Sequence, residues 1–210
     1  MHTRSQSLIP MVRDRLAVGE VAIIPTPLSY IFILDGRNAE AASRVLSLKG
    51  VRADSGITPL GLLTHRDQAD RWGQMTAAAD ELMTLWPAPI SLMVTKSHRL
   101  PDWITPYQSV ALACPDSFCA ELAAALPFPI ACVGANPSGE FLVTRYSHAA
   151  QLYQGQVNLI LDGGTCPLAM ASTMVDCSID PPVLARYGPV TMEQLRQIIP
   201  DLQAVSHLMK

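Results

Sequence analysis

The stretch from Val157 to Asp176 reads VNLILDGGTCPLAMASTMVD, and the rest of the chain is best interpreted outward from it. It opens with a mainly apolar run, Val157–Leu161, of the length and composition of a strand. Asp162-Gly163-Gly164 ends that run, because glycine adopts the positive φ angles that tight turns use. A second short strand, Thr173–Val175, follows Ser172. Two interpretations remain open: a plain hairpin with a polar edge, or a wall of a binding site that carries hydroxyl groups at the start of a strand.

The composition indicates one ordinary globular domain. The chain has 210 residues, of which 49% are hydrophobic and 16% are charged. That is enough for one domain with a proper core, and it is unlike the composition of disordered chains. The formal net charge of −3 argues against a broad phosphate-binding surface but leaves room for a local basic patch.

The chain shows no sign of secretion, of a membrane span or of a metal site. Residues 1–16 lack the apolar core and cleavage site of a signal peptide, and no apolar run approaches the ~20 residues of a membrane helix. The five cysteines form no C-x-x-C pair, and the five histidines have no ligand spacing. We therefore expect a cytoplasmic protein with reduced cysteines, no membrane partner and no protein-held metal.

Strands and helices alternate along the chain, which predicts one α/β domain over residues 18–210 after a partly helical lead-in, residues 1–17. The expected strands are Val21–Ile24, Pro59–Leu63, Ile90–Val94, Ser109–Ala113, Ile130–Val133 and Val183–Ala185, of which Ser109–Ala113 should be buried on both faces. The expected helices are Ala39–Leu48 after an Asn38 cap, Asp67–Leu85, Phe118–Leu126, Thr144–Tyr153 with Thr144 as cap, and Met192–Ile199 after a Thr191 cap.

The motifs of the C-terminal half resemble those of a known enzyme family. LILDGG is followed by Cys166-Pro167, by Ser172-Thr173 with Val175-Asp176, and by a strand that ends in Arg186-Tyr187-Gly188-Pro189. This order resembles the YrdC-like threonylcarbamoyl-AMP synthase family, and the resemblance extends over nearly the whole chain. It implies a twisted, open, mixed sheet flanked by helices, with a central concave cleft. It also implies synthesis of threonylcarbamoyl-adenylate from threonine, bicarbonate and ATP, for the t6A modification of tRNA.

The resemblance also implies roles for residues that match the family motifs. Lys49 would supply positive charge for the phosphates during catalysis, together with Arg52, which lies one residue beyond the arginine position of the family motif, where this chain has Val51. The expected nucleotide-binding residues are Ser109, Asn136, Ser138 and Arg186, and the expected substrate-binding residues are Thr26, Tyr30, Ser172 and Thr173. The cofactor would be ATP with Mg²⁺, the metal being held mainly by phosphates and water. RNA is a further partner that the family suggests.

Three positions depart from the family pattern toward apolar residues. Leu28 stands where the family has a threonine, Leu63 where it has a histidine, and Ala113 where it has the arginine that pairs with the threonine carboxylate. Losing such a charged hydrogen bond typically costs about 1.5–3 kcal/mol of binding free energy. The sequence therefore predicts an altered amino-acid pocket.

Three functions remain open on the sequence. The first is adenylate chemistry, acyl or carbamoyl, with a substrate other than threonine. The second is a genuine threonylcarbamoyl-AMP synthase with a rearranged pocket, in which Arg52 and His65 replace the missing groups. The third is a non-catalytic module that binds RNA or a protein on the same fold. We favour the first, because Lys49, Ser172 and Arg186 are all present.

Overall fold

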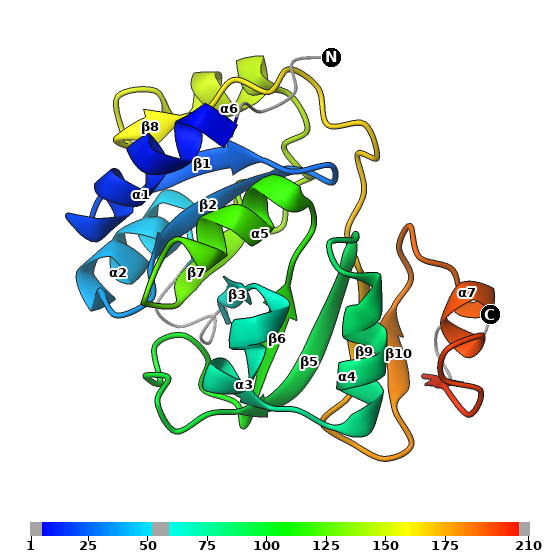
Figure 1. The fold of residues 1–210 in the computed structure, drawn as a ribbon. Coiled ribbons are helices and arrows are strands. Elements are labelled where there is room, and N and C mark those ends of the chain that lie inside the picture. Colours follow the sequence, from blue (N-terminus) through cyan, green and yellow to red (C-terminus); the bar gives the residue numbers. More distant parts are fainter. Residues whose placement is uncertain (1–5, 52–58, 206–210) are drawn as a thin grey trace.

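The computed structural model describes residues 6–51 and 59–205, and within them it forms one large mixed sheet (Figure 1). The strand order is β11-β10-β9-β5-β6-β3-β7-β2-β1-β8, with the short β4 paired to β5. The strands are β1 (Ala22–Pro25), β2 (Tyr30–Asp35), β3 (Gly61–Leu63), β4 (Gly73–Gln74), β5 (Ile90–Lys96), β6 (Ser109–Ala113), β7 (Ile130–Gly134), β8 (Leu159–Ile160), β9 (Thr173–Asp176), β10 (Val183–Arg186) and β11 (Gln203–Ala204).

The sheet is mixed and strongly twisted, as the resemblance implied. Parallel pairs such as β3–β6 and β5–β9 alternate with antiparallel pairs such as β5–β6 and β2–β7. Figure 1 shows β1 and β2 running across the view while β5, β9 and β10 run down it. The predicted fold class, a twisted mixed α/β sheet flanked by helices, is confirmed.

Helices pack on both faces of the sheet. They are α1 (Ile9–Ala17), α2 (Ala39–Leu48), α3 (Ala69–Trp72), α4 (Ala77–Leu82), α5 (Ser117–Ala124), α6 (Tyr146–Tyr153) and α7 (Met192–Arg196), with short 3-10 turns at Gln6–Leu8, Arg66–Gln68 and Met83–Leu85. The larger core cluster lies under α2, α4, α6 and α7. A second cluster lies under α1 and α5, where α1 contributes Ile9, Val12 and Leu16. The helical part of the N-terminal lead-in is thus packed into the core. No helix of the described residues is long and apolar enough to cross a membrane.

Two helices begin at the caps that the sequence predicts. The Asn38 side chain accepts a hydrogen bond of 3.0 Å from the amide of Ala41 at the start of α2. Thr191 and Gln194 form a reciprocal capping box at the start of α7. Polar side chains before an apolar periodic run therefore located these helix starts correctly, although α7 ends at Arg196, before the predicted Ile199.

The hairpin interpretation of the stretch 157–176 is wrong. β8 pairs with β1 at one end of the sheet, whereas β9 pairs with β5 and β10 near the other end. Residues 161–172 cross between them, so the Gly-Gly turn does not join two neighbouring strands. A turn sequence does not by itself determine which strands pair. Here β8 pairs with β1 and β9 pairs with β5, both of which are distant in the sequence.

The predicted helices Asp67–Leu85 and Thr144–Tyr153 also need correction. The first is broken by β4, because Gly73 lies so close to β5 that a Cβ there would sit 2.3 Å from a methyl carbon of Val94. A new helix, α4, then starts at a Thr76 cap. The second begins at Tyr146 rather than at a Thr144 cap, since the Thr144 carbonyl accepts a hydrogen bond from the Cys166 amide.

Candidate active site

A cavity of about 480 Å³ lies on one face of the sheet. Its floor includes a row of residues aligned across five neighbouring strands: Arg186 lies opposite Met174, Met174 opposite Ser91, Ser91 opposite Ala113, and Ala113 beside Leu63. All five line the cavity. The prediction that strand β6 is buried on both faces is therefore wrong. Alternate residues of β6 face the cavity and are only partly buried.

Small side chains make the middle of this face hollow. Ala111 lies opposite Met93 on β5, and Gly61 lies opposite Cys132 on β7. A Cβ at Gly61 would lie 3.3 Å from the Ala111 carbonyl oxygen, so a larger residue would crowd the floor. Burial raises the pKa of the Cys132 thiol to about 12. The middle of the floor is thus apolar, and the Cys132 thiol is uncharged at neutral pH.

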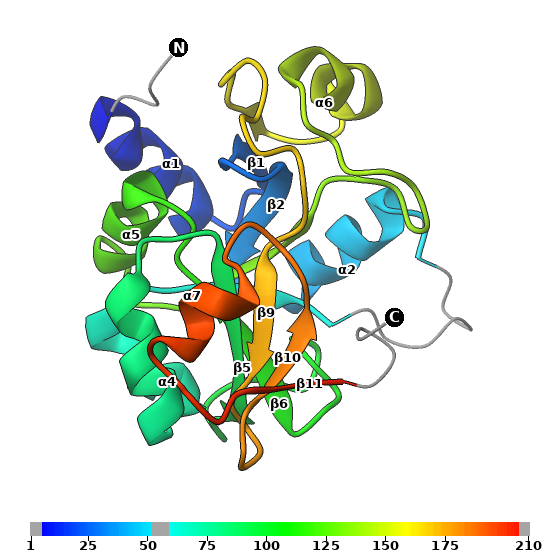
Figure 2. The same ribbon diagram turned by 90° about the vertical axis from the view of Figure 1, so that its right-hand side faces the viewer.

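Residues 161–172, which we call the strap, run from β8 to β9 (Figures 1 and 2). The last three of them, Met170, Ala171 and Ser172, line one side of the cavity. The Tyr30 hydroxyl donates to the Gly164 carbonyl at 3.0 Å and accepts from the Gly163 amide at 3.1 Å. The Leu168 amide donates to the Pro27 carbonyl at 2.9 Å. The strap is thereby attached to the turn between β1 and β2, and its last residues line the cavity.

Arg186 and two serines form a polar chain at one end of the cavity. The guanidinium of Arg186 donates to the carbonyl and to the hydroxyl of Ser172, at 2.9 and 2.8 Å. The Ser172 hydroxyl lies 2.9 Å from that of Ser91. Burial lowers the pKa of Arg186, and no described carboxylate forms an ion pair with it. This cation is therefore available to an anionic ligand.

Lys49 lies behind the cavity rather than in its wall. The residue is only 5% exposed, and its Nζ donates to the carbonyl of Gly134 at 2.5 Å and to that of Asn136. Its own carbonyl accepts from the Ser138 amide at 2.7 Å. Desolvation lowers the pKa of Lys49 to about 8. In this structure Lys49 holds the loop 134–138 in place.

The loop 134–138 brings one of its two predicted residues to the cavity. Asn136 lines it, and its amide nitrogen donates to the carbonyls of Pro137 and Glu140, at 3.2 and 3.1 Å. A Cβ at Gly134 would lie 2.6 Å from the Asn136 side-chain oxygen. Gly134 therefore makes room for the Asn136 side chain. Ser138 is exposed and lies outside the described cavity lining.

The predicted substrate-binding residues divide into two groups. Thr26 and Ser172 line the cavity, and the Thr26 hydroxyl accepts from the amides of Leu28 and Ser29, both at 3.1 Å, which fixes the β1–β2 turn. Tyr30 and Thr173 are fully buried and lie outside the lining. Tyr30 holds the strap, and the Thr173 hydroxyl exchanges hydrogen bonds of 2.9 Å with the backbone of Val190. These two residues support the cavity from behind.

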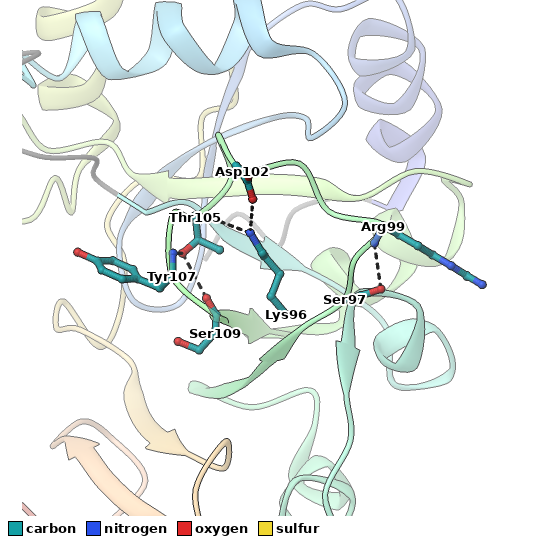
Figure 3. Close-up of polar contacts among 7 residues, drawn as sticks. All are labelled: Lys96, Ser97, Arg99, Asp102, Thr105, Tyr107 and Ser109. Carbon is teal, nitrogen blue, oxygen red and sulfur yellow. Dashed lines mark hydrogen bonds and ion pairs between the residues drawn. The ribbon is translucent and has the colours of Figure 1, made fainter.

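Ser109 lines the cavity beside a loop whose contribution the sequence analysis missed. Residues 97–108 join β5 to β6, and Lys96 fixes them by donating to Asp102 at 2.7 Å and to the Thr105 carbonyl at 3.0 Å (Figure 3). The Thr105 hydroxyl donates to the Ser109 carbonyl and accepts from the Tyr107 amide, both at 3.2 Å. Tyr107 lines the cavity and is 58% exposed. No motif marks it in the sequence, whereas Ser91 could have been noticed as a hydroxyl within an apolar strand.

Two expected contributors remain to be placed, Arg52 and His65. Arg52 lies outside the described residues. His65 is absent from the described lining, and its ring accepts from the Asp67 amide. Nor do the described residues contain a cluster of three or more His, Cys, Asp or Glu that could hold a metal.

The three apolar residues that depart from the family pattern all face this one cavity: Leu28, Leu63 and Ala113 line it together with Arg186 and Ser172.

The profile of the Sua5/YciO/YrdC family, described as telomere recombination, matches residues 14–188. The chain belongs to the Sua5/YciO/YrdC family. The matched residues include the strap, the β1–β2 turn and Arg186 on β10.

Two curated relatives of this chain are named threonylcarbamoyl-AMP synthase. The chain is 29% identical over 198 residues to the threonylcarbamoyl-AMP synthase of Bacillus subtilis, covering 88% of this chain and 54% of that protein. It is 28% identical over 190 residues to a threonylcarbamoyl-AMP synthase of Pyrococcus abyssi, with 88% and 55% covered. The chain thus spans about half the length of these two relatives.

Solved structures agree with the family. Pyrococcus abyssi Sua5 complexed with L-threonine superposes with a TM-score of 0.86 at 26% identity, covering 95% of this chain and 59% of that chain. Escherichia coli YciO superposes with a TM-score of 0.78 at 17% identity, covering 92% and 95%, and supports the fold alone.

Proposed function

We propose that the cavity binds ATP and catalyses formation of an acyl- or carbamoyl-adenylate whose second substrate is not threonine. One observation carries the proposal: Leu28, Leu63 and Ala113 share a cavity with the guanidinium of Arg186, which forms no ion pair with a described carboxylate. The charged end suits phosphates. The apolar end lacks the charged partners that the ionised groups of an amino acid need once they leave water.

The nucleotide would lie next to the hydrogen-bond donors of the cavity lining. Arg186 would offset phosphate charge, and Ser109 and Asn136 offer polar groups in the wall. Lys49 would act through the loop 134–138, because its Nζ points at the loop carbonyls rather than into the cavity. Such chemistry needs mainly the two reactants held in line and the phosphate charge offset.

Mg²⁺ would accompany the ATP. The described lining contains no carboxylate, so phosphate oxygens and water would be its ligands, as is usual for this ion at nucleotide sites. The ion would offset phosphate charge beside Arg186.

A genuine threonylcarbamoyl-AMP synthase for tRNA modification is the second candidate. It is favoured by the superposition on Pyrococcus abyssi Sua5, whose structure contains L-threonine. It requires a partner for the threonine carboxylate, and Arg52 would be the group to supply it.

Calorimetric titration with MgATP, with and without threonine and bicarbonate, separates these candidates. Under the proposed function ATP binds, and threonine leaves its affinity within about twofold. Tighter ATP binding with threonine would instead identify a working threonylcarbamoyl-AMP synthase. Complete absence of ATP binding would reject both enzymes and favour a non-catalytic binding module.

A further inference from the structure

The described lining of the cavity contains a single charged side chain. That side chain is Arg186, and no Asp, Glu, Lys or His lines the cavity beside it. The remaining polar groups are hydroxyls, amides and the protonated Cys132 thiol. A ligand ammonium group would therefore be desolvated without a carboxylate to pair with, which is strongly unfavourable.

The one charge of the lining lies at one end of the row of aligned residues, with Met174 between Arg186 and Ser91. Arg186 and Ser91, joined through Ser172, occupy one end, and Ala113 followed by Leu63 occupies the other. Leu28 from the β1–β2 turn also lines the cavity and is 8% exposed. An occupant of the row therefore needs an anionic group at one end and an uncharged apolar group at the other.

The strand spacing limits the length of that occupant. Ser91 and Leu63 are two strands apart in the row, a separation of about 10 Å at the usual spacing between neighbouring strands. Allowing about 4 Å for van der Waals contact, the apolar part has room for about four or five carbon atoms.

We propose that the second substrate is a short aliphatic carboxylic acid without an amino group, bound with its carboxylate near Arg186, Ser172 and Ser91 and its chain over Ala113 and Leu63. This inference rests on the proposed function. A carboxylate oxygen attacks the α-phosphorus of ATP and forms the new O–P bond. The bond from that phosphorus to the α,β-bridging oxygen breaks, and its electron pair leaves with pyrophosphate. The products are the acyl-adenylate and pyrophosphate, and no bicarbonate is consumed.

The test compares 3-methylbutanoate with L-valine, which differ only by the ammonium group on the α-carbon. Pyrophosphate release by the full chain with MgATP is measured with each acid, and with threonine plus bicarbonate. We expect 3-methylbutanoate to give a kcat/KM at least tenfold above that of valine or threonine. Equal or greater activity with valine or threonine would overturn the inference.

Two variants locate the apolar end. Leu63→Asn should lower kcat/KM for 3-methylbutanoate at least tenfold and leave the affinity for MgATP within about twofold. The control is Ile179→Asn, an aliphatic-to-amide change at an exposed residue between β9 and β10 and outside the described lining, which should change neither value. Because Leu63 is buried and its variant can misfold, Ala113→Asp provides an independent test: a carboxylate there should shift the preference toward valine at least tenfold. An unchanged preference in Ala113→Asp would contradict the placement.

Ligand-observed NMR distinguishes the two proposals. Saturation transfer from the protein to the methyl protons of 3-methylbutanoate reports binding without turnover. If MgATP binds and no transfer occurs, the proposed function survives and the aliphatic acid is rejected. If MgATP does not bind, the proposed function and the adenylation step fail together.

Discussion

Lys49 shows how a residue identified by a motif can make contacts in the structure that the motif does not indicate. The motif implied contact with phosphates, yet its Nζ donates to two carbonyls of the loop 134–138, and its own carbonyl accepts from Ser138. Sequence comparison identifies the residue type but not the direction of a side chain with four rotatable bonds. The consequence is a buried amine without a described carboxylate beside it, whose pKa falls to about 8.

The depressed pKa of Lys49 predicts that stability rises with pH in a defined range. The folded-state pKa is about 8, against 10.5 for the exposed amine. Between these values the unfolded chain binds more protons, so the free energy of unfolding increases as pH rises. Relative to the Lys49→Met variant, the free energy of unfolding of the wild type should increase by about 2 kcal/mol from pH 7.5 to pH 10.

Urea denaturation of both proteins at each pH measures this difference. The variant cancels the titration of tyrosines and cysteines, which both proteins share. A difference that stays constant or falls with pH would show that Lys49 keeps its ordinary pKa in the folded protein.

The β5–β6 loop is the element whose position at the cavity depends on one partly buried lysine, Lys96. Lys96 is 11% exposed at its side chain, whereas its partner Asp102 is 94% exposed. Exposed ion pairs contribute little to the free energy of unfolding. The hydrogen bond from Lys96 to the Thr105 carbonyl, by contrast, satisfies a backbone group of a residue that is only 1% exposed. The backbone contact should therefore matter more than the ion pair.

Lys96→Met should loosen the loop that carries Tyr107. We expect a loss of about 1 kcal/mol in unfolding free energy and faster amide hydrogen exchange at Tyr107, because Thr105 would be less firmly held. Asp102→Asn is the matched control and should leave exchange at Tyr107 unchanged. If the two variants behave alike, the ion pair rather than the carbonyl contact holds the loop.

Most of the elements could be predicted from the sequence, and the errors have a common cause. The Asn38 and Thr191 caps and the apolar strands depend on local patterns, so the sequence contains their signal. The break at Gly73 depends on how closely that residue approaches β5. The partners of β8 and β9 depend on strands far away in the chain. Local periodicity contains neither kind of information.

The candidate site was predictable in the same uneven way. Thr26, Ser109, Asn136, Ser172 and Arg186 were expected and line the cavity. The expectation that Leu28, Leu63 and Ala113 share one pocket came from the resemblance. No local pattern indicates it, because the strand register and the β1–β2 turn bring the three residues together. Tyr107 and Met93 carried no motif, and only the folded sheet shows that they face the cavity.

At the scale of the whole molecule, the strap joins distant parts of the sheet. It starts beside β1, where the Leu161 amide donates to Ile23, and ends at β9 beyond the cavity (Figure 2). Tyr30 on β2 holds it by one hydroxyl that bonds both to the Gly163 amide and to the Gly164 carbonyl. One oxygen atom thus links β2 to the segment that delivers Ser172 to the cavity.

Removing this hydroxyl should weaken the link without changing the core. Tyr30→Phe leaves the Gly163 amide without its partner, and we expect a loss of about 1–2 kcal/mol in unfolding free energy with faster hydrogen exchange at Gly163. Tyr153→Phe is the matched control, because the Tyr153 hydroxyl is buried with no hydrogen-bond partner among the described residues. Its removal should leave stability unchanged or raise it. Equal losses of unfolding free energy in the two variants would mean that the environment of the ring, and not the hydroxyl bond to the strap, determines the loss. The strap would then be held by its other contacts, at Pro27 and Thr144.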